Sequence, residues 1–231
     1  MTFQIVTVYA TGPTLSFPGG EEFKTFDNRR NEFSPAEAYQ KLLEECPADV
    51  IIYAHSDLTV HDPEWLGRLM ALFAREECVA AGFGGATALG NLDLYRKKYN
   101  IWNLARRGYG SNQTDAEVHG ERFTGDRRGA VLDAFLMAVR CAWLRDLGGW
   151  PSDNIGHHCL DLWLACEAAR RGKEIWTAGV DCTHHGGGAS TTDSYARAKW
   201  LRGQTLEEDH QRPHRWLANS FRDVLPIEVE S

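Results

Sequence analysis

The feature that most constrains this chain is a five-residue run, Val50–Ala54 (VIIYA), in which every residue is apolar. A short, β-rich run of this kind predicts a strand that is buried on both faces of a sheet. Such strands occur mainly in parallel sheets, because helices then cover both faces. The chain is therefore expected to fold as an α/β protein.

Predicted strands and helices alternate on both sides of this strand, as expected of an α/β protein. The predicted strands are Phe3–Tyr9 and residues 22–26 and 78–83, and the predicted helices are residues 35–46 and 65–73. Ser34 and Glu37 form a capping box around Pro35 at the start of the first helix, and Asp62 with Pro63 is expected to begin the second. The order β-β-α-β-α-β predicts a mostly parallel mixed sheet flanked by helices.

The second half of the chain resumes this pattern after a weaker stretch. Residues 84–129 are rich in Gly, Arg, Asn and Asp, with a predicted helix near residues 92–104. A stretch this long is expected to be functional or mobile. The elements predicted beyond it are a strand over residues 131–139, helices over 140–147 and 160–171, a strand over 174–182, and amphipathic helices from residue 190 onward.

Length and composition are those of an ordinary globular protein. The 231 residues suffice for one α/β domain, and 43% of them are apolar and 25% charged. The formal net charge of −7 is opposite in sign to that expected of a general nucleic-acid binder. A basic strip over residues 96–107 is interpreted as a solvated surface.

The cysteines and the N-terminal residues indicate the cellular compartment of the protein. The six cysteines form no C-x-x-C pair and have apolar neighbours, which is typical of reduced, buried thiols. Residues 1–10 are predicted to form a strand rather than a signal peptide. No apolar run approaches the roughly 20 residues of a membrane span. We expect a cytoplasmic protein without an integral membrane segment.

Polar clusters follow several of the predicted strands. In open α/β sheets, ligands bind beyond the carboxyl ends of the strands. The clusters are residues 9–11, Asp27-Asn28, His55-Ser56-Asp57 and His184-His185. A carboxylate such as Asp57 can ligate a divalent ion that binds phosphates, although Asp is also common in turns.

Two further positions have both a chemical and a structural interpretation. His184 and His185 precede three glycines, which allow close approach to a ligand, and histidine is a frequent metal ligand as well as a structural residue. Asp161 begins a predicted helix, where the helix dipole favours its ionised form. That carboxylate can accept a proton from a hydroxyl, or it can simply be a helix-terminal residue.

The order of these segments resembles the family-2-type glycosyltransferases with the GT-A fold. The nucleotide-sugar half of that family is similar to residues 27–28, 36–40 (AEAYQ) and 48–69, in which His55-Ser56-Asp57 matches a His-x-Asp form of the metal motif. The acceptor half is similar to residues 132–140, the Gly-Gly-aromatic turn at 147–151, His158-x-x-Asp161 and His184. The resemblance covers residues 3–200 without residues 84–130. His55, Gln40 and Trp163 depart from the usual Asp, Asn and second acid.

The resemblance implies a metal-dependent, inverting glycosyltransferase that moves a sugar from a nucleotide-diphosphate sugar to an acceptor hydroxyl. Asp57 with His184 or His185 would hold Mn²⁺ or Mg²⁺, and Asp161 would be the catalytic base. UDP is the expected nucleotide. The implied nucleotide-binding residues are Thr7, Tyr9, Thr11, Asp27, His55 and Asp57, and the implied sugar or acceptor contacts are Asp133, Trp150 and His158.

The implied organisation is a single GT-A domain, residues 1–200, followed by a C-terminal helical extension, residues 201–231. Its parts are a nucleotide-binding half (1–84), a variable acceptor or lid segment (85–130), and an acceptor and catalytic half (131–200). The acceptor stays open among a glycan, a lipid-linked sugar, a protein, a small molecule and a modified nucleobase.

Two other functions fit the same residues. A metal-dependent hydrolase would need three or more protein ligands and an open water position. A non-catalytic sugar-nucleotide or glycan-binding module is suggested by His55 and Trp163, which stand where the family has acids.

Overall fold

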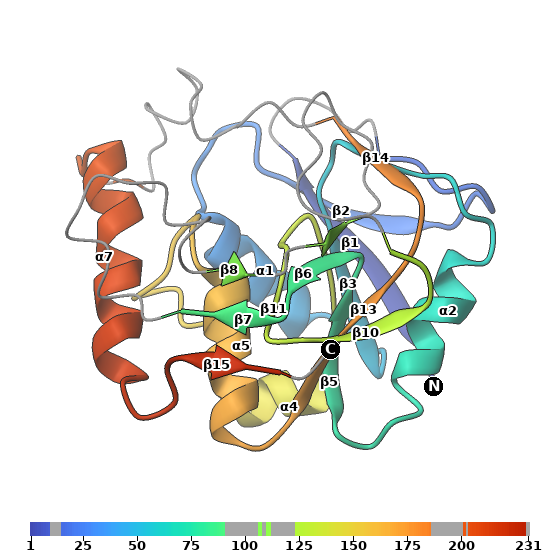
Figure 1. Ribbon diagram of the computed structural model, residues 1–231. Helices are drawn as coiled ribbons and strands as arrows, with labels where there is room; N and C mark the ends of the chain where they lie inside the picture. The colour runs from blue at the N-terminus through green and yellow to red at the C-terminus, as the bar shows by residue number, and fades with distance from the viewer. Residues whose placement is uncertain are drawn as a thin grey trace.

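A seven-stranded sheet runs through the middle of the molecule in the order β10-β13-β5-β12-β3-β1-β2 (Figure 1). Its strands are β1 (Phe3–Tyr9), β2 (Phe23–Asp27), β3 (Val50–Ala54), β5 (Cys78–Gly82), β10 (Asp126–Gly129), β12 (Leu136–Arg140) and β13 (Glu174–Ala178). This computed structural model describes residues 1–9, 15–90, 106–107, 110–111, 123–185, 201 and 203–229.

The sheet is mixed, as predicted. β1 pairs in parallel with β2 and β3, and β13 pairs in parallel with β5. β12 is antiparallel to both β3 and β5, and β10 is antiparallel to β13. Five of the seven strands therefore run in one direction, and their carboxyl ends share one edge of the sheet. Such an edge is where α/β proteins bind ligands.

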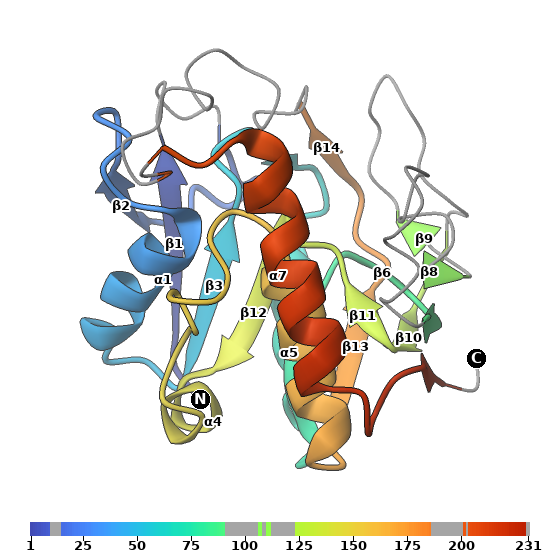
Figure 2. The same ribbon diagram turned by 90° about the vertical axis from the view of Figure 1, so that its left-hand side faces the viewer.

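Helices cover both faces of the sheet (Figures 1 and 2). One face carries α1 (Pro35–Glu44), α4 (Cys141–Asp146), α5 (Leu160–Arg170) and α7 (Leu206–Ser220), and the other carries α2 (Trp65–Leu72). Tyr39, Trp163 and Leu217 are buried in the core of the first face, and Trp65 and Leu69 in that of the second.

Short strands form three smaller sheets. They are β4 (Leu58–Val60) with β14 (Cys182–His184), β11 (Val131–Leu132) with β6 (Gly84–Ala86) and β9 (Gly110–Ser111), and β7 (Ala88–Leu89) with β8 (Arg106–Arg107) and β15 (Ile227–Glu228). Leu217 and Phe221 are buried in the main core, and β15 pairs with β7. The C-terminal segment is thus packed into the body of the fold.

The predicted capping box and the predicted buried, reduced thiols are both confirmed. Ser34 Oγ accepts from the Glu37 N–H and the Ser34 N–H donates to Glu37 Oε2, at 3.2 and 2.7 Å, which is the predicted capping box. All six cysteines are buried and free. No helix in the described ranges is long and apolar enough to cross a membrane.

Two predictions of element bounds and one prediction of a helix cap are wrong. Residues 131–139 form two strands in different sheets, because the chain turns at Asp133, whose N–H donates to the Gly84 carbonyl. The predicted strand over residues 174–182 ends at Ala178, and Cys182 begins β14. The start of α2 at Trp65 is as predicted, but its N-cap is Glu64 rather than Asp62 with Pro63, and Asp62 Oδ1 accepts from the Glu64 N–H in the turn before the helix. The helix expected near residues 92–104 and the glycines at 186–188 lie outside the described residues.

Candidate functional site

A two-stranded ribbon brings distant parts of the chain together at the carboxyl edge of the sheet. β4 follows β3 directly, and β14 pairs with it in antiparallel register, with His184 opposite Leu58. The His185 N–H donates to the Asp57 carbonyl at 2.8 Å and extends this pairing. The ribbon therefore fixes His184 beside the loop that holds His55 and Asp57.

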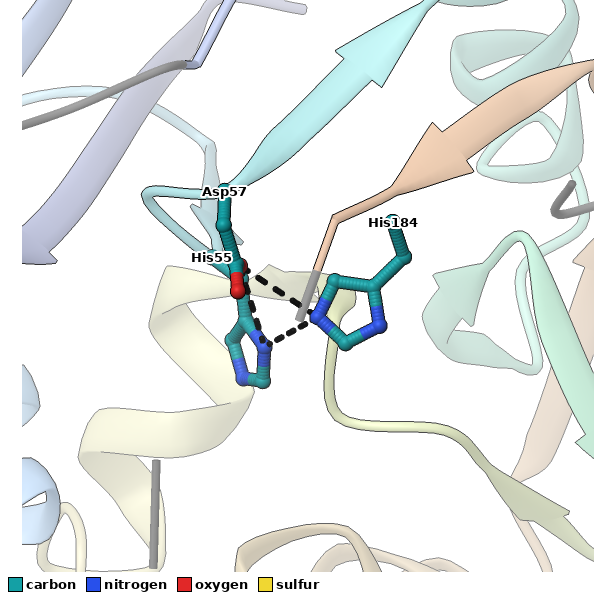
Figure 3. A group of neighbouring side chains, drawn as sticks. All are labelled: His55, Asp57 and His184. Carbon is teal, nitrogen blue, oxygen red and sulfur yellow. Dashed lines mark hydrogen bonds and ion pairs between the residues drawn. The ribbon is translucent and has the colours of Figure 1, made fainter. Parts of the chain in front are cut away.

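Three side chains converge at this ribbon (Figure 3). Nδ1 of His55 lies 3.2 Å from Nε2 of His184, which lies 3.3 Å from Oδ1 of Asp57. The His55 and Asp57 atoms are 4.0 Å apart. The Asp57 side chain keeps 37% of its surface exposed, so this group is open to a ligand. We call His55, Asp57 and His184 the ribbon triad.

Strand alternation explains why His184 and not His185 joins the triad. Successive side chains of a strand point to opposite faces. His185 Nε2 lies 3.0 Å from Thr59 Oγ1, and Thr183 Oγ1 lies 2.7 Å from His61 Nε2, so these residues occupy the other face of the ribbon. The prediction left the choice between the two histidines open, and the geometry favours His184.

Neighbouring residues hold the triad in place. The His55 N–H donates to the Phe135 carbonyl at 2.9 Å. The buried Phe135 ring stacks on the His184 imidazole, with centroids 5.4 Å apart and planes inclined by 22°. Phe135 lies between β11 and β12, so the turn that splits the predicted strand also supports the site.

The pKa values of the triad residues favour the binding of a cation. Burial alone would raise the pKa of Asp57, but the hydrogen bond from His184 and the charges of both histidines hold that pKa below its usual value. Burial and then the charge of His184 lower the pKa of His55 to about 4. At neutral pH, Asp57 is thus an anion and His55 a neutral ligand.

The spacing of the three atoms fits a metal ion. Ligand atoms at about 2.1 Å from an octahedral ion lie about 3.0 Å apart, close to the two shorter distances of the triad. Two imidazoles and one carboxylate form a mixed donor set that suits transition metals better than magnesium, which prefers oxygen. His55 was predicted as a nucleotide-binding residue, and the structure adds it to the candidate ligands.

The predicted nucleotide-binding residues of the first two strands differ in their exposure to solvent. Asp27 is at the end of β2, exposed, and opposite Tyr9 in the register. It is ion-paired with Arg29 at 2.6 Å, and this partner lowers its pKa to about 2. Thr7 is fully buried, which argues against the predicted contact through its side chain. The side chain of Tyr9 and the whole of Thr11 lie outside the described residues.

Asp161 lies in the first turn of α5, as predicted. Its Oδ1 accepts from the Leu162 N–H at 2.9 Å, and only 3% of the residue is exposed. The preceding Cys159 has a φ of 72°, which is uncommon for a residue other than glycine. Such backbone strain is often found at functional sites.

Trp150 has a structural position, which corrects the prediction that it contacts a sugar. It is 3% exposed, and its indole N–H donates to the buried Tyr53 hydroxyl at 3.0 Å. Gln40 Oε1 accepts from the Trp150 N–H at 2.8 Å. A Cβ on Gly149 would come within 2.1 Å of that same Gln40 oxygen. The Gly-Gly-Trp turn therefore packs against α1 through Gln40 and against α5 through Trp163.

His158 faces α7 instead of the triad. Its ring lies 4.5 Å from that of His210 between centroids, and its Nε2 lies 3.9 Å from the buried Asp209 carboxylate. With His157 and His214 it makes a row of edge-to-face rings. We call His157, His158, His210 and His214 the interhelical histidines. A sugar contact through His158 is not supported by this position.

Asp133 and His157 are two further described residues whose charges interact with His55. The charge of Asp133 raises the pKa of His55, so this predicted sugar or acceptor residue does lie near the triad. Burial and then the charge of His55 lower the pKa of His157 to about 4, which places His157 near the triad as well. His157 was not predicted, because its position depends on the loop before α5.

The fold belongs to the GT-A class. The solved structure of GalNAc-T7 with UDP, GalNAc and Mn²⁺ superposes with a TM-score of 0.56 at 11% identity, over 98% of this chain and 55% of that one. A mannosyltransferase from Pyrobaculum calidifontis, in complex with GDP-Man and Mn²⁺, gives a TM-score of 0.49 at 15% identity, over 96% and 64%. This chain thus spans about half the length of the first structure.

Residues 9–203 match the family described as "Glycosyltransferase like family", and the chain belongs to that family. A comparison with curated protein sequences found no match.

Proposed function

We propose that this protein is a metal-dependent glycosyltransferase that moves a sugar from a nucleotide-diphosphate sugar to an acceptor hydroxyl with inversion. The ribbon triad carries the proposal, because it gathers three metal-ligand atoms at the sheet edge where α/β proteins bind nucleotides. Membership of a glycosyltransferase family supports the reaction class.

His55, Asp57 and His184 would hold the ion, and the mixed donor set favours Mn²⁺ over Mg²⁺. A bound divalent ion would supply the charge that stabilises a departing diphosphate. The GalNAc-T7 structure contains UDP and Mn²⁺, which supports the same nucleotide and ion for this chain. Asp27, exposed at the end of β2, is the candidate partner for the nucleoside.

Asp161 is the candidate catalytic base. The N-terminus of α5 favours its carboxylate form, which can accept the proton of the acceptor hydroxyl as that oxygen attacks the anomeric carbon. The hydroxyl oxygen forms the new glycosidic bond while the bond to the diphosphate breaks on the opposite side, so the configuration inverts. Asp161 is buried in this structure, at 3% exposure, so transfer requires that its carboxylate become accessible to the acceptor.

The base and metal roles are separable by mutation. Asp161→Asn keeps the shape and removes the basicity, so transfer should fall by at least ~10²-fold while the affinity for UDP with Mn²⁺ is unchanged. Asp57→Asn should weaken UDP binding first. Calorimetry with UDP and with GDP, with and without EDTA, measures the binding, and product formation measures transfer. Glu167→Gln, on the outer part of α5, is the matched control.

Two results would contradict this division of roles. Near-normal transfer by Asp161→Asn would place the base elsewhere, with Asp133 or Asp153 the next candidates. Equal UDP affinity with and without EDTA would remove the metal from the mechanism.

A metal-dependent hydrolase is the second candidate, because the triad supplies the three protein ligands that such an enzyme needs. Hydrolysis of substrates that carry no nucleotide sugar, lost in His184→Ala, would favour it. UDP binding without any turnover would instead favour a binding module.

A further inference from the structure

A polar cavity of about 120 Å³ lies where three segments meet: the start of α1, the loop before α5 and the residues that lead into α7. Its volume is several times the space that one water requires, which is on the order of 15 Å³. The cavity is lined by Ser34, Glu37, Ser152, Asp153, Gly156, Leu201, Gln204 and Arg212.

The walls of this cavity are held together by hydrogen bonds. The Ala36 N–H donates to the Gly156 carbonyl at 3.1 Å, and Arg212 Nη1 donates to the Asp153 carbonyl at 3.2 Å. The start of α1 is already capped, since the Glu37 N–H donates to Ser34 Oγ. The helix terminus therefore has few donors to offer, and recognition depends on the side chains of the other two segments.

Those side chains carry unused hydrogen-bonding groups. Arg212 Nε is buried and has no hydrogen-bond partner in the part of the chain that is described. Over the same residues, the side chains of Ser152, Asp153 and Gln204 make no hydrogen bond or ion pair. The cavity thus offers a guanidinium and an amide as donors, and a carboxylate, a hydroxyl and an amide oxygen as acceptors.

The charges decide what kind of ligand fits. Arg212 is the single cation among the described lining residues, and Asp153 and Glu37 are anions, so a phosphate would meet two carboxylates. Leu201 is the single large apolar residue of that lining, so a lipid chain would bury little apolar surface there. Neutral hydroxyl groups both donate and accept, and they match this mixture of groups. A saccharide is the ligand class with several such groups on a rigid ring.

One loop connects the cavity with the surroundings of the ribbon triad. Gly156, which lines it, precedes His157, and His157 is close enough to His55 for their charges to interact. The same loop continues to Asp161 at the start of α5. The loop before α5 therefore lines the cavity at Gly156 and leads directly to the proposed base, Asp161.

We propose that this cavity binds a saccharide unit of the acceptor, with Arg212, Gln204 and Asp153 as the recognising side chains. The assignment of this saccharide to the acceptor rests on the proposed glycosyltransferase function. Its ligand class rests on the cavity alone.

Saturation-transfer NMR on the full chain, with glucose, galactose, mannose and N-acetylglucosamine as probes, tests the proposal. At least one of these sugars should bind, and Arg212→Ala should weaken its binding at least ~10-fold, as expected when hydrogen bonds to a charged group are lost. Gln204→Ala, in the loop before α7, should weaken it less and guards against misfolding of the arginine variant. Arg215→Ala, on the exposed face of α7, is the control that should bind normally.

The affinity for UDP with Mn²⁺ is measured on the same variants and should stay unchanged. Absence of binding by all four sugars, sugar binding that survives both substitutions, or displacement of the sugar by inorganic phosphate would each overturn the proposal. Sugar binding lost in Arg212→Ala, in a protein that never binds UDP, would support the ligand class of the cavity and overturn the proposed function.

Discussion

Histidines gather in two regions of this molecule, and the two regions differ in how the rings are arranged. In the ribbon triad, two imidazole nitrogens and a half-exposed carboxylate point at one another, within 4.8 Å. The interhelical histidines pack edge to face between the loop before α5 and helix α7, with centroids 4.5 to 5.0 Å apart. Within the described residues, no three ligand atoms of that second region converge. Convergence of ligand atoms, rather than the number of histidines, therefore distinguishes a metal site from a helix interface.

The largest expected difference between the regions is in metal affinity. His184→Ala should weaken Mn²⁺ binding by ~100-fold or more, since even the outer partners of metal ligands commonly contribute 10–100-fold. His210→Ala, in the second region, should leave that affinity unchanged. Calorimetric titration of Mn²⁺ into both variants measures the contrast. Similar losses in the two variants would show that the ribbon triad is not the metal site.

The interhelical histidines should instead make stability depend on pH. Burial and the neighbouring histidines lower the pKa of His158 to about 2, and burial lowers that of His210, against which the charge of Asp209 acts. The unfolded chain, with ordinary histidine pKa values near 6.5, therefore binds protons first as the pH falls. Stability should be full above about pH 6.5 and should decline below it, by up to about 1.4 kcal/mol per pH unit for each such histidine.

Urea unfolding of the metal-free protein at several pH values between 7.5 and 5 measures this decline. His158→Gln should make it shallower, while His61→Gln, on the exposed side of the ribbon, should not. A decline that His158→Gln leaves unchanged would assign the pH dependence to other groups, including His55, whose pKa is also lowered by burial.

The smallest expected effect concerns His185, which directly follows β14. His185→Ala removes the contact with Thr59 on the outer face and leaves the three ligand atoms in place. Mn²⁺ affinity should therefore fall by less than ~10-fold, the lower end for residues outside the ligand shell. A loss as large as that of His184→Ala would mean that both histidines bind the ion.

Much of the fold could be predicted from the sequence, because its signals are local. The run Val50–Ala54 became a central strand buried along its length, and Ser34 with Glu37 capped α1. Residues 131–139 show where local signals fail. Their apolar run continues across Asp133, but the pairing of β11 with β6 takes it out of the central sheet, and pairing is a property of distant residues.

The candidate site could be predicted only in part, because it also depends on the pairing of distant residues. Asp57 and His184 could be proposed from their places after strands, and Asp161 from its place at a helix start. The inclusion of His55 and the preference for His184 over His185 depend on the ribbon register, which the sequence alone does not reveal. The family resemblance implies a sugar or acceptor contact for Trp150, but its indole lies in the core and donates to the Tyr53 hydroxyl.

The β4–β14 ribbon also has a consequence for the chain as a whole. His55 and His184 are separated by 129 residues, so an ion held between them would tie off most of the domain as a single loop. An ion bound only by the folded chain stabilises it by mass action, by about 2.7 kcal/mol at a hundred times its dissociation constant. The proposed catalytic ion would thus also act as a removable cross-link between distant parts of the chain, and withdrawing it should lower the free energy of unfolding.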